Sequence, residues 1–404
     1  MTRPASGPVN ATPDSAATAA LRKALPGLLT LTLSTFVGVT TEMLPVGLLP
    51  LIGDAFAISD SQAGLLVSLY ALMVAVLAVP LTLATSRLPR KPLLVSTLGC
   101  YVLSNLLVSL APTLAVMAAG RVLGGLTHAL FFSVCIGYAT RLVPNQLTGR
   151  ALAIASAGVS AGFVLGVPLG VSLGTAVGWR GAFAALTVCA LIALVLALVV
   201  LPAVPSTVSR TPARREQLWP MVTVISSNTL AYLGHYMLFT YVTVVLLGAG
   251  AVPQAVGPLL LLFGGLGLAA LLIVSRYFDS HLRASGIGIV ATIVIGIIGV
   301  ASTYPMLAAV VVAALVWNTG FGPVSSLYQA AAVRTGATSP EIAGAWTNAT
   351  CNAGIAIGAA IGGLVLDQIG ISAVAWTSAV LVAAALTIML IATRAFPRHQ
   401  GTRR

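Results

Sequence analysis

Residues 202–218 read PAVPSTVSRTPARREQL and form the longest polar break in the chain. On each side of this break, about six apolar runs alternate with short segments that hold charged and turn residues. A helix needs about 20 apolar residues to cross roughly 30 Å of hydrocarbon. The pattern predicts an all-α polytopic membrane protein with twelve transmembrane helices in two six-helix halves. We expect the spans near residues 25–50, 62–85, 92–111, 113–140, 151–177, 181–201, 219–247, 254–275, 284–304, 306–333, 342–366 and 371–393.

Nearly all basic residues fall on one side of these spans. Of the 20 Lys and Arg residues, 18 lie in the tails or in even-numbered connections, and the exceptions are Arg180 and Arg121. Basic residues are retained on the cytoplasmic side, so we expect both termini in the cytoplasm of a cell whose plasma membrane holds the protein. This predicts a disordered cytoplasmic tail at 1–24, a six-helix bundle at 25–201, a cytoplasmic linker at 202–218, a second bundle at 219–393 and a cytoplasmic tail at 394–404.

Composition excludes several classes of protein. Hydrophobic residues make up 58% of the chain and charged residues 7%, whereas a soluble protein carries roughly a quarter charged residues. Twelve spans leave only short loops, so no soluble catalytic domain and no enzyme activity is expected. The net charge of +12 is scattered over the cytoplasmic segments, which favours anionic lipid of the bilayer over nucleic acid as a partner. No phosphate-binding loop, metal-ligand spacing or cofactor motif is found.

A glycine pattern repeats between the two halves. Glycine recurs every fourth residue in spans five and eleven, offset by 196 residues, at Gly158, Gly162 and Gly166 and at Gly354, Gly358 and Gly362. Such spacing gives a smooth helix face for close packing, although coincidence is an alternative because the chain has 40 glycines. Two parallel six-span repeats joined by a central linker are the arrangement of major facilitator transporters.

Several segments resemble that superfamily in detail, in particular its twelve-span drug:proton antiporter branch and the arabinose-efflux-permease-like proteins. The resemblance covers about residues 25–393. It rests on TTEMLPVGLLPLIGDAFAISDSQAGLLVSLYAL (40–72), RVLGGLTHALFFSV (121–134), GVSAGFVLGVPLG (158–170), GWRGAF (178–183) and NAGIAIGAAIGG (352–363). It implies two pseudo-symmetric bundles around a central cavity, alternating access, and a monomer whose only energy source is the proton gradient, without a cofactor.

The loop between spans two and three departs from the family pattern G-x-L-x-D-R-x-G-R-R/K. Here TLATSRLPRK (82–91) keeps Arg87 and Arg90 but has Ser86 where the family has aspartate. The matching loop of the second half, RYFDSHLR (276–283), retains Asp279. In the family this loop latches the cytoplasmic helix ends, so Arg87, Arg90 and Asp279 are candidate gating residues. Ordinary anchoring of arginines at the cytoplasmic surface is an equal alternative.

Two ionisable residues, Glu42 and Arg121, stand well inside predicted spans. Each costs roughly 2.5–3.5 kcal/mol at mid-membrane, so each is expected to face a partner or water. Counted at 1.5 Å per residue, Glu42 lies about 25 Å and Arg121 about 30 Å from the cytoplasmic ends of their helices. We predict that Glu42 carries a coupling proton and that the nearby guanidinium of Arg121 sets its affinity. The alternative is a static Glu–Arg pair that locks two helices together.

Other polar residues in the spans are weaker candidates. His128 lies two turns after Arg121 on the same helix face and could relay protons, or could be a packing residue. His235 and Tyr241 in span seven, with Asn348 and Asn352 one turn apart in span eleven, are candidate substrate contacts; helix packing is the alternative. Gly162, Gly166, Pro168 and Gly170 resemble the antiporter element of span five and are candidate gating residues.

These observations predict a secondary active transporter that exports a small organic molecule in exchange for protons. With one acid and one base deep in the spans, a neutral substrate such as an amphenicol-like drug, a sugar or a nucleoside is expected. Uptake by proton symport or uniport is the alternative. A transporter-like sensor or membrane enzyme is disfavoured because no catalytic cluster or long soluble loop is found.

Overall fold

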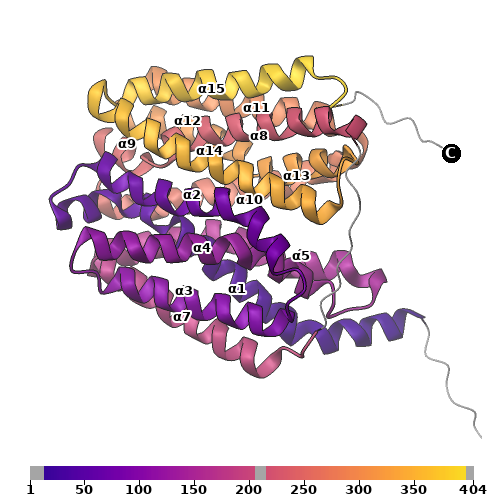
Figure 1. Cartoon of the computed structure of the whole chain (residues 1–404). Helices are drawn as coiled ribbons and strands as arrows, with labels where there is room; N and C mark the ends of the chain where they lie inside the picture. Colours follow the sequence, from indigo (N-terminus) through magenta and orange to yellow (C-terminus); the bar gives the residue numbers. More distant parts are fainter. Residues whose placement is uncertain (1–12, 205–214, 397–404) are drawn as a thin grey trace, which may run out of the picture.

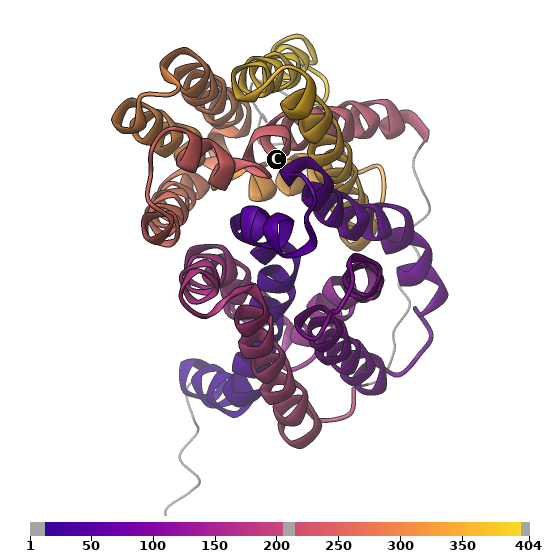
Figure 2. The same cartoon turned by 90° about the vertical axis from the view of Figure 1, so that its left-hand side faces the viewer.

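The structure, a computed structural model, describes residues 13–204 and 215–396, and every regular element in these two ranges is a helix. Twelve helical spans there are long and apolar enough to cross a membrane, which confirms the predicted fold class. Two bundles lie side by side (Figure 1 and, viewed from one end, Figure 2). The first consists of α1 (Pro13–Phe56), α2 (Asp60–Ala84), α3 (Arg90–Ser109), α4 (Leu114–Ala139), α5 (Thr148–Ala161), α6 (Val167–Val177) and α7 (Trp179–Val200). The second consists of α8 (Leu218–Phe239), α9 (Val242–Gly248), α10 (Pro253–Val274), α11 (Phe278–Thr303), α12 (Leu307–Phe321), α13 (Val324–Arg334), α14 (Pro340–Gln368) and α15 (Ile371–Ile391).

The first helix is longer than the expected span of residues 25–50. It begins at Pro13, inside the stretch expected to be a tail, and ends at Phe56. The part of this helix that is apolar enough to cross a membrane runs from Ala19 to Phe56. The helix continues beyond residue 50 although Pro26, Pro45 and Pro50 lie inside it. Each of these prolines lacks an N–H, so the carbonyl four residues earlier has no helical donor.

Proline also interrupts span five. Between α5 and α6 lies one π-helical turn, η2 (Gly162–Gly166), in which the N–H of Val167 donates to the carbonyl of Gly162. Pro168 follows directly and cannot donate to the helix. A π turn inserts one residue into the helical ladder, so the face of span five changes at this point.

The glycine repeat marks equivalent helix pairs in the two bundles. A Cβ at Gly158 would lie 1.9 Å from the Thr32 carbonyl of α1, so span five approaches span one at backbone distance. A Cβ at Gly358 would lie 2.5 Å from the Leu233 carbonyl of α8, so span eleven approaches span seven in the same way. The same internal pairing therefore occurs in each half, which gives the fold its pseudo-symmetry.

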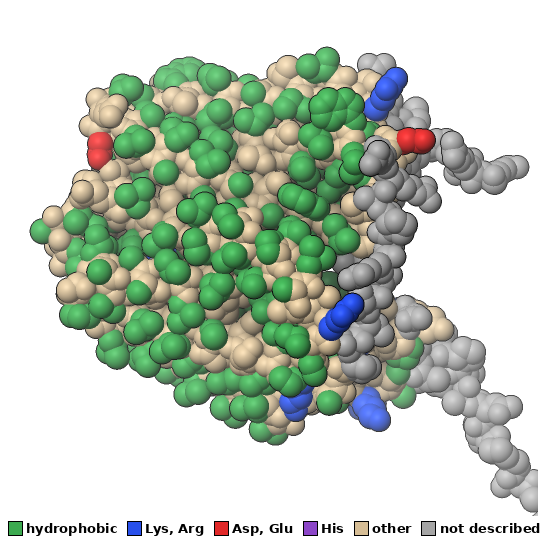
Figure 3. All heavy atoms as spheres, viewed as in Figure 1, with side chains coloured by type: hydrophobic (Ala, Val, Ile, Leu, Met, Phe, Trp, Pro, Cys, Tyr) green, Lys and Arg blue, Asp and Glu red, His purple; other side chains and the backbone are tan. Residues whose placement is uncertain are grey.

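Charge divides the molecule into two ends. The Lys and Arg side chains visible in Figure 3 gather at the end where α13 and the first part of α1 lie in Figure 1. We call this the basic end; it holds the turn between α2 and α3 and the turn between α10 and α11, with Arg90 and Arg276. The other end, the far end, holds the turns from α1 to α2 and from α14 to α15.

The bundles contact each other through α2 and α14, α6 and α10, and α1 and α9. At the far end, Ser59 caps α2 in a capping box with Gln62, which fixes the first turn of this helix. In that turn, the Ser61 hydroxyl donates a hydrogen bond to the Asp367 carboxylate at the end of α14. The two bundles are thus joined by side chains at the far end.

Candidate functional site

Arg121 of α4 lies at the centre of the first bundle and is 1% exposed. Its Nη1 donates to the Thr41 carbonyl at 2.6 Å, its Nη2 to the Glu42 carbonyl at 2.9 Å, and its Nε to the Leu66 carbonyl at 3.2 Å. Pro45 has no N–H and leaves the Thr41 carbonyl without its helical donor. Arg121 satisfies this carbonyl and joins α4 to α1 and α2 through their main chains.

The Glu42 carboxylate is buried, with 6% of the residue exposed. Its Oε2 lies 3.6 Å from His128 Nε2. Its Oε1 has no hydrogen-bond partner among the residues that the structure describes. Glu42 therefore combines a partner that can donate a proton with an oxygen that is left without a donor.

Sequence reasoning predicted that Glu42 and Arg121 lie at similar depth, and the structure brings them together. The guanidinium binds the main chain of Glu42 rather than its carboxylate, so the contact is not the side-chain pair of the static alternative. The reason is that Pro45 leaves the Thr41 carbonyl without a helical donor, and this carbonyl makes the shortest contact with the guanidinium. The effect of Arg121 on the proton affinity of Glu42 stays a prediction.

His128 is held by α2 and by its own helix. Its Nδ1 lies 2.9 Å from the Tyr70 hydroxyl of α2, and its ring packs on Phe132 at 4.7 Å between centroids. Gly125 allows this arrangement, because a Cβ there would lie 2.4 Å from the Tyr70 carbonyl. Arg121 covers the face of the same tyrosine, with Cζ 4.2 Å from the ring centroid.

The second bundle holds His235 in an aromatic cage. Trp317 Nε1 donates to His235 Nδ1 at 2.9 Å, and the ring stacks on Phe321 and Phe239. Since Nδ1 accepts this hydrogen bond, the neutral ring carries its proton on Nε2. His235, which was predicted as a substrate contact, is 1% exposed. Phe321 and Phe239 stack on its ring, and Trp317 occupies Nδ1.

The other predicted substrate contacts are Tyr241, which follows α8, and the asparagines Asn348 and Asn352 of α14. Tyr241 follows the end of α8, and its hydroxyl donates to the Ala359 carbonyl of α14 at 2.8 Å. Asn348 is half-buried, whereas Asn352 is buried and donates to the Asn348 carbonyl at 3.1 Å and to its Oδ1 at 3.3 Å. The Oδ1 of Asn352 is buried without a partner in the described part of the chain. The two asparagines therefore form one polar unit on α14.

The predicted gating residues differ in their surroundings. Arg87 is exposed in the turn after α2. Arg90 is the first residue of α3, and its Nη2 donates to the Ser86 carbonyl at 3.4 Å. Asp279 lies in α11, but its side chain is outside the described residues. Arg283, four residues further along α11, is buried and donates to the Phe396 carbonyl at 2.8 Å and the Leu390 carbonyl at 2.6 Å.

The glycines of span five lie against α1. A Cβ at Gly162, Gly166 or Gly170 would meet Val39 at 3.0 Å, Thr40 at 2.1 Å and Leu44 at 2.6 Å, respectively. Pro168, two residues after the end of the π turn, is buried. This element therefore packs on the part of α1 that leads to and includes Glu42.

Sequence reasoning missed several residues of these clusters. Tyr70 and Trp317 lie in apolar runs, where an aromatic residue is indistinguishable from ordinary packing. Asn105 of α3 is buried and donates to the Thr41 hydroxyl at 3.0 Å; a lone asparagine in an apolar span was an available signal. The free carbonyl of Thr41 could also have been inferred from Pro45.

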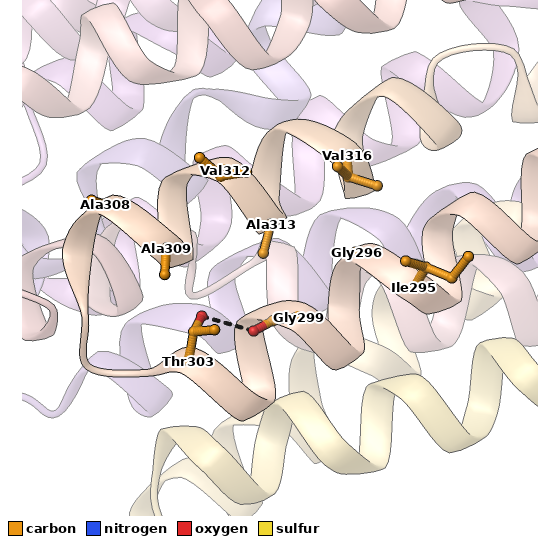
Figure 4. Close-up of a pocket in the computed structure, with 9 residues that line it drawn as sticks. All are labelled: Ile295, Gly296, Gly299, Thr303, Ala308, Ala309, Val312, Ala313 and Val316. Carbon is orange, nitrogen blue, oxygen red and sulfur yellow. Dashed lines mark hydrogen bonds between the residues drawn. The ribbon is translucent and has the colours of Figure 1, made fainter.

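A groove of about 510 Å³ lies elsewhere, between α11 and α12 (Figure 4). Its lining is apolar except for Thr303, and includes Ile295 and Val312, which are 64% and 61% exposed. None of its lining residues belongs to the Glu42 or His235 clusters. Its place on the outside of the bundle sets it apart from the candidate site.

Two solved structures with the same fold are transporters. A bacterial homologue of the human lysosomal transporter Spinster, in an inward-facing unoccupied conformation, matches with a TM-score of 0.68 and 15% identity over 95% of this chain and 99% of that chain. The human organic anion transporter MFSD10 (TETRAN) matches with a TM-score of 0.64 and 16% identity over 91% of this chain and 99% of that chain. At these identities the likeness shows the fold.

Sequence comparisons place the chain in a family. A chloramphenicol efflux pump of Mycobacterium tuberculosis is 30% identical over 356 residues, 82% of this chain and 84% of the relative. A probable sugar efflux transporter of Mannheimia succiniciproducens is 28% identical over 373 residues, 90% of this chain and 92% of the relative. The family model of the Major Facilitator Superfamily matches residues 31–351. The chain is therefore a multi-pass membrane transporter for small molecules, not an enzyme, and belongs to the major facilitator superfamily.

Proposed function

We propose that this transporter exports a small, largely uncharged organic molecule in exchange for protons, by alternating access. The observation that carries the proposal is the Glu42 carboxylate, buried beside His128 with one oxygen lacking a donor. An acid in such surroundings binds a proton readily and releases it when water or a donor reaches it. The names of the two relatives, a chloramphenicol efflux pump and a probable sugar efflux transporter, support export and a small organic substrate.

The place of Glu42 favours a role in coupling. The next residue of α1, Met43, accepts a hydrogen bond from the Tyr236 hydroxyl of the second bundle at 3.5 Å. Glu42 therefore adjoins the surface along which the bundles move relative to each other. A carboxylate there exchanges protons with one side or the other as the bundles rock, whereas Arg121 keeps α1 and α4 together.

Substrate is proposed to bind between the bundles near Asn348 and Asn352, since the half-buried Asn348 amide and the unpartnered Asn352 oxygen can hydrogen-bond a neutral ligand. His235 and Tyr241 then shape the site from behind. Span five is proposed to act as a gate, because its π turn and close contact with α1 let it reorient without opening a large void.

The protein is proposed to act as a monomer in the plasma membrane with both termini in the cytoplasm. The clustering of basic residues at one end supports this orientation. No cofactor is proposed, since the proton gradient supplies the energy.

The test uses inside-out vesicles whose lumen is acidified by respiration and reports luminal pH with a dye. Chloramphenicol, sugars and nucleosides are added one at a time. We expect at least one compound to release luminal protons with the native protein and none with Glu42→Gln. Glu216→Gln, a change at an exposed acid near the start of α8, is the matched control. Proton release that persists in Glu42→Gln would refute the role of Glu42 in coupling.

A further inference from the structure

Tyr70 and Glu42 approach opposite nitrogens of the same imidazole. The Tyr70 hydroxyl lies 2.9 Å from His128 Nδ1, and Glu42 Oε2 lies 3.6 Å from His128 Nε2. Tyr70 and His128 are 0% and 3% exposed, and Glu42 is 6% exposed. Because a neutral imidazole carries a single N–H, the hydrogen bond at Nδ1 determines whether Nε2 can donate to the Glu42 carboxylate.

The surroundings decide which way the Tyr70–His128 hydrogen bond runs. A neutral imidazole has one donor nitrogen and one acceptor nitrogen. The guanidinium of Arg121 sits 4.2 Å above the Tyr70 ring and draws electron density from the phenol, which strengthens its O–H as a donor. Tyr70 then donates to Nδ1, and the imidazole proton resides on Nε2, the nitrogen that faces Glu42.

We infer that Tyr70 is a positioning residue of the proton site, because it fixes His128 in the tautomer whose Nε2–H stabilises the ionised Glu42. The inference rests on the proposed coupling role of Glu42. At 3.6 Å the contact is longer than a hydrogen bond. It suits a neutral Glu42, and it shortens when the acid loses its proton and attracts the N–H. His128 is thus a neutral donor rather than a second carrier of the transported proton.

The other groups that face His128 are consistent with this assignment. From α1 the ring meets Glu42, and from its own helix α4 it packs on Phe132. Arg121 of the same helix places its guanidinium over the Tyr70 ring, next to His128. From α3, Tyr101 packs on Phe131, and Phe131 packs on Phe132, whose ring contacts His128.

The experiment titrates Glu42 directly, without a substrate. The purified full-length protein in lipid vesicles is followed by infrared spectroscopy of the carboxylic-acid C=O stretch, and the Glu42 signal is the difference from Glu42→Gln. Tyr70→Phe should move the midpoint of this titration to higher pH by about one unit, since the ionised acid loses its oriented donor. Tyr328→Phe, which also removes a buried hydroxyl with a 2.8 Å contact, to Ser227 in the second bundle, should leave the midpoint unchanged.

Two substitutions of His128 separate donation from proton carriage. Glutamine places an amide N–H near the position of Nε2, so His128→Gln should keep the midpoint within about 0.3 pH unit of the native value, whereas His128→Leu should shift it as Tyr70→Phe does. An unchanged midpoint in Tyr70→Phe, or an equal shift in the Gln and Leu variants, would overturn the inference. Size-exclusion profiles and circular dichroism verify that each variant is folded.

The proposed function fails separately from this inference. If Glu42→Gln still couples transport to protons, the coupling role of Glu42 is wrong whatever the titration shows. If Glu42→Gln abolishes coupling and Tyr70→Phe leaves the midpoint in place, only the role assigned to Tyr70 is wrong.

Discussion

Replacing Arg121 with lysine distinguishes a main-chain clamp from a charge partner. Lysine keeps the positive charge near Glu42 but concentrates its donors at one point. The guanidinium reaches three carbonyls, at 2.6, 2.9 and 3.2 Å, on α1 and α2, and an ammonium group can reach one of them well. Two hydrogen bonds from a charged group are lost, each contributing about 1.5 kcal/mol. We expect Arg121→Lys to lower the free energy of unfolding by about 3 kcal/mol.

Unfolding by SDS in mixed micelles, followed by tryptophan fluorescence, measures this change. Arg180→Lys is the matched control, since Arg180 is an exposed arginine whose Nη2 donates to the Ala111 carbonyl at 2.9 Å. Its effect should stay within about 0.5 kcal/mol. Pro45→Ala supplies the N–H that the Thr41 carbonyl lacks. The double variant Arg121→Lys/Pro45→Ala should therefore be more stable than the sum of the single changes by about 1 kcal/mol. An Arg121→Lys variant as stable as the Arg180 control would refute the clamp.

Two other predictions concern contacts between and within the bundles. Cysteines introduced by Ser61→Cys and Asp367→Cys should form a disulfide that stops transport of a substrate found in the vesicle assay, and a reductant should restore transport. Each single cysteine variant is the control. Full activity of the cross-linked protein would show that the far end need not open. Gly358→Ala should lower stability by about 2 kcal/mol because its Cβ would lie 2.5 Å from a main-chain carbonyl, whereas Gly265→Ala on α10, where no atom lies within 4 Å, should be neutral or stabilising. Equal effects of the two alanines in SDS unfolding would contradict the close-packing argument.

The sequence predicted the twelve spans because each requirement for crossing a bilayer is local: an apolar run of sufficient length and basic residues in alternate loops. The ends of the spans were less predictable. Helix α1 begins at Pro13 and continues past Pro50, since packing against the rest of its bundle maintains a helix that local proline signals would end.

The neighbourhood of Glu42 was predictable from depth along the helices, whereas its chemistry was not. Counting residues places Glu42 and Arg121 at one level but does not say which oxygen the guanidinium binds. That choice depends on Pro45 four residues after Thr41, a relation between main-chain atoms of one helix and a side chain of another. Tyr70 and Trp317 were missed for a different reason, because their role comes from the histidine that each contacts.

Two of the three prolines inside α1 give this helix two separate attachment points. Pro45 releases the Thr41 carbonyl to Arg121 of the same bundle. Pro50 releases the Val46 carbonyl, and the Thr243 hydroxyl of the other bundle lies 3.4 Å from it and 3.3 Å from the Gly47 carbonyl. Protein engineers can use this separation. Changes at Pro45 should alter how firmly one bundle holds together, and changes at Pro50 should alter the ratio of conformations, so a state-locked transporter for structure determination can be sought at Pro50 without weakening the fold.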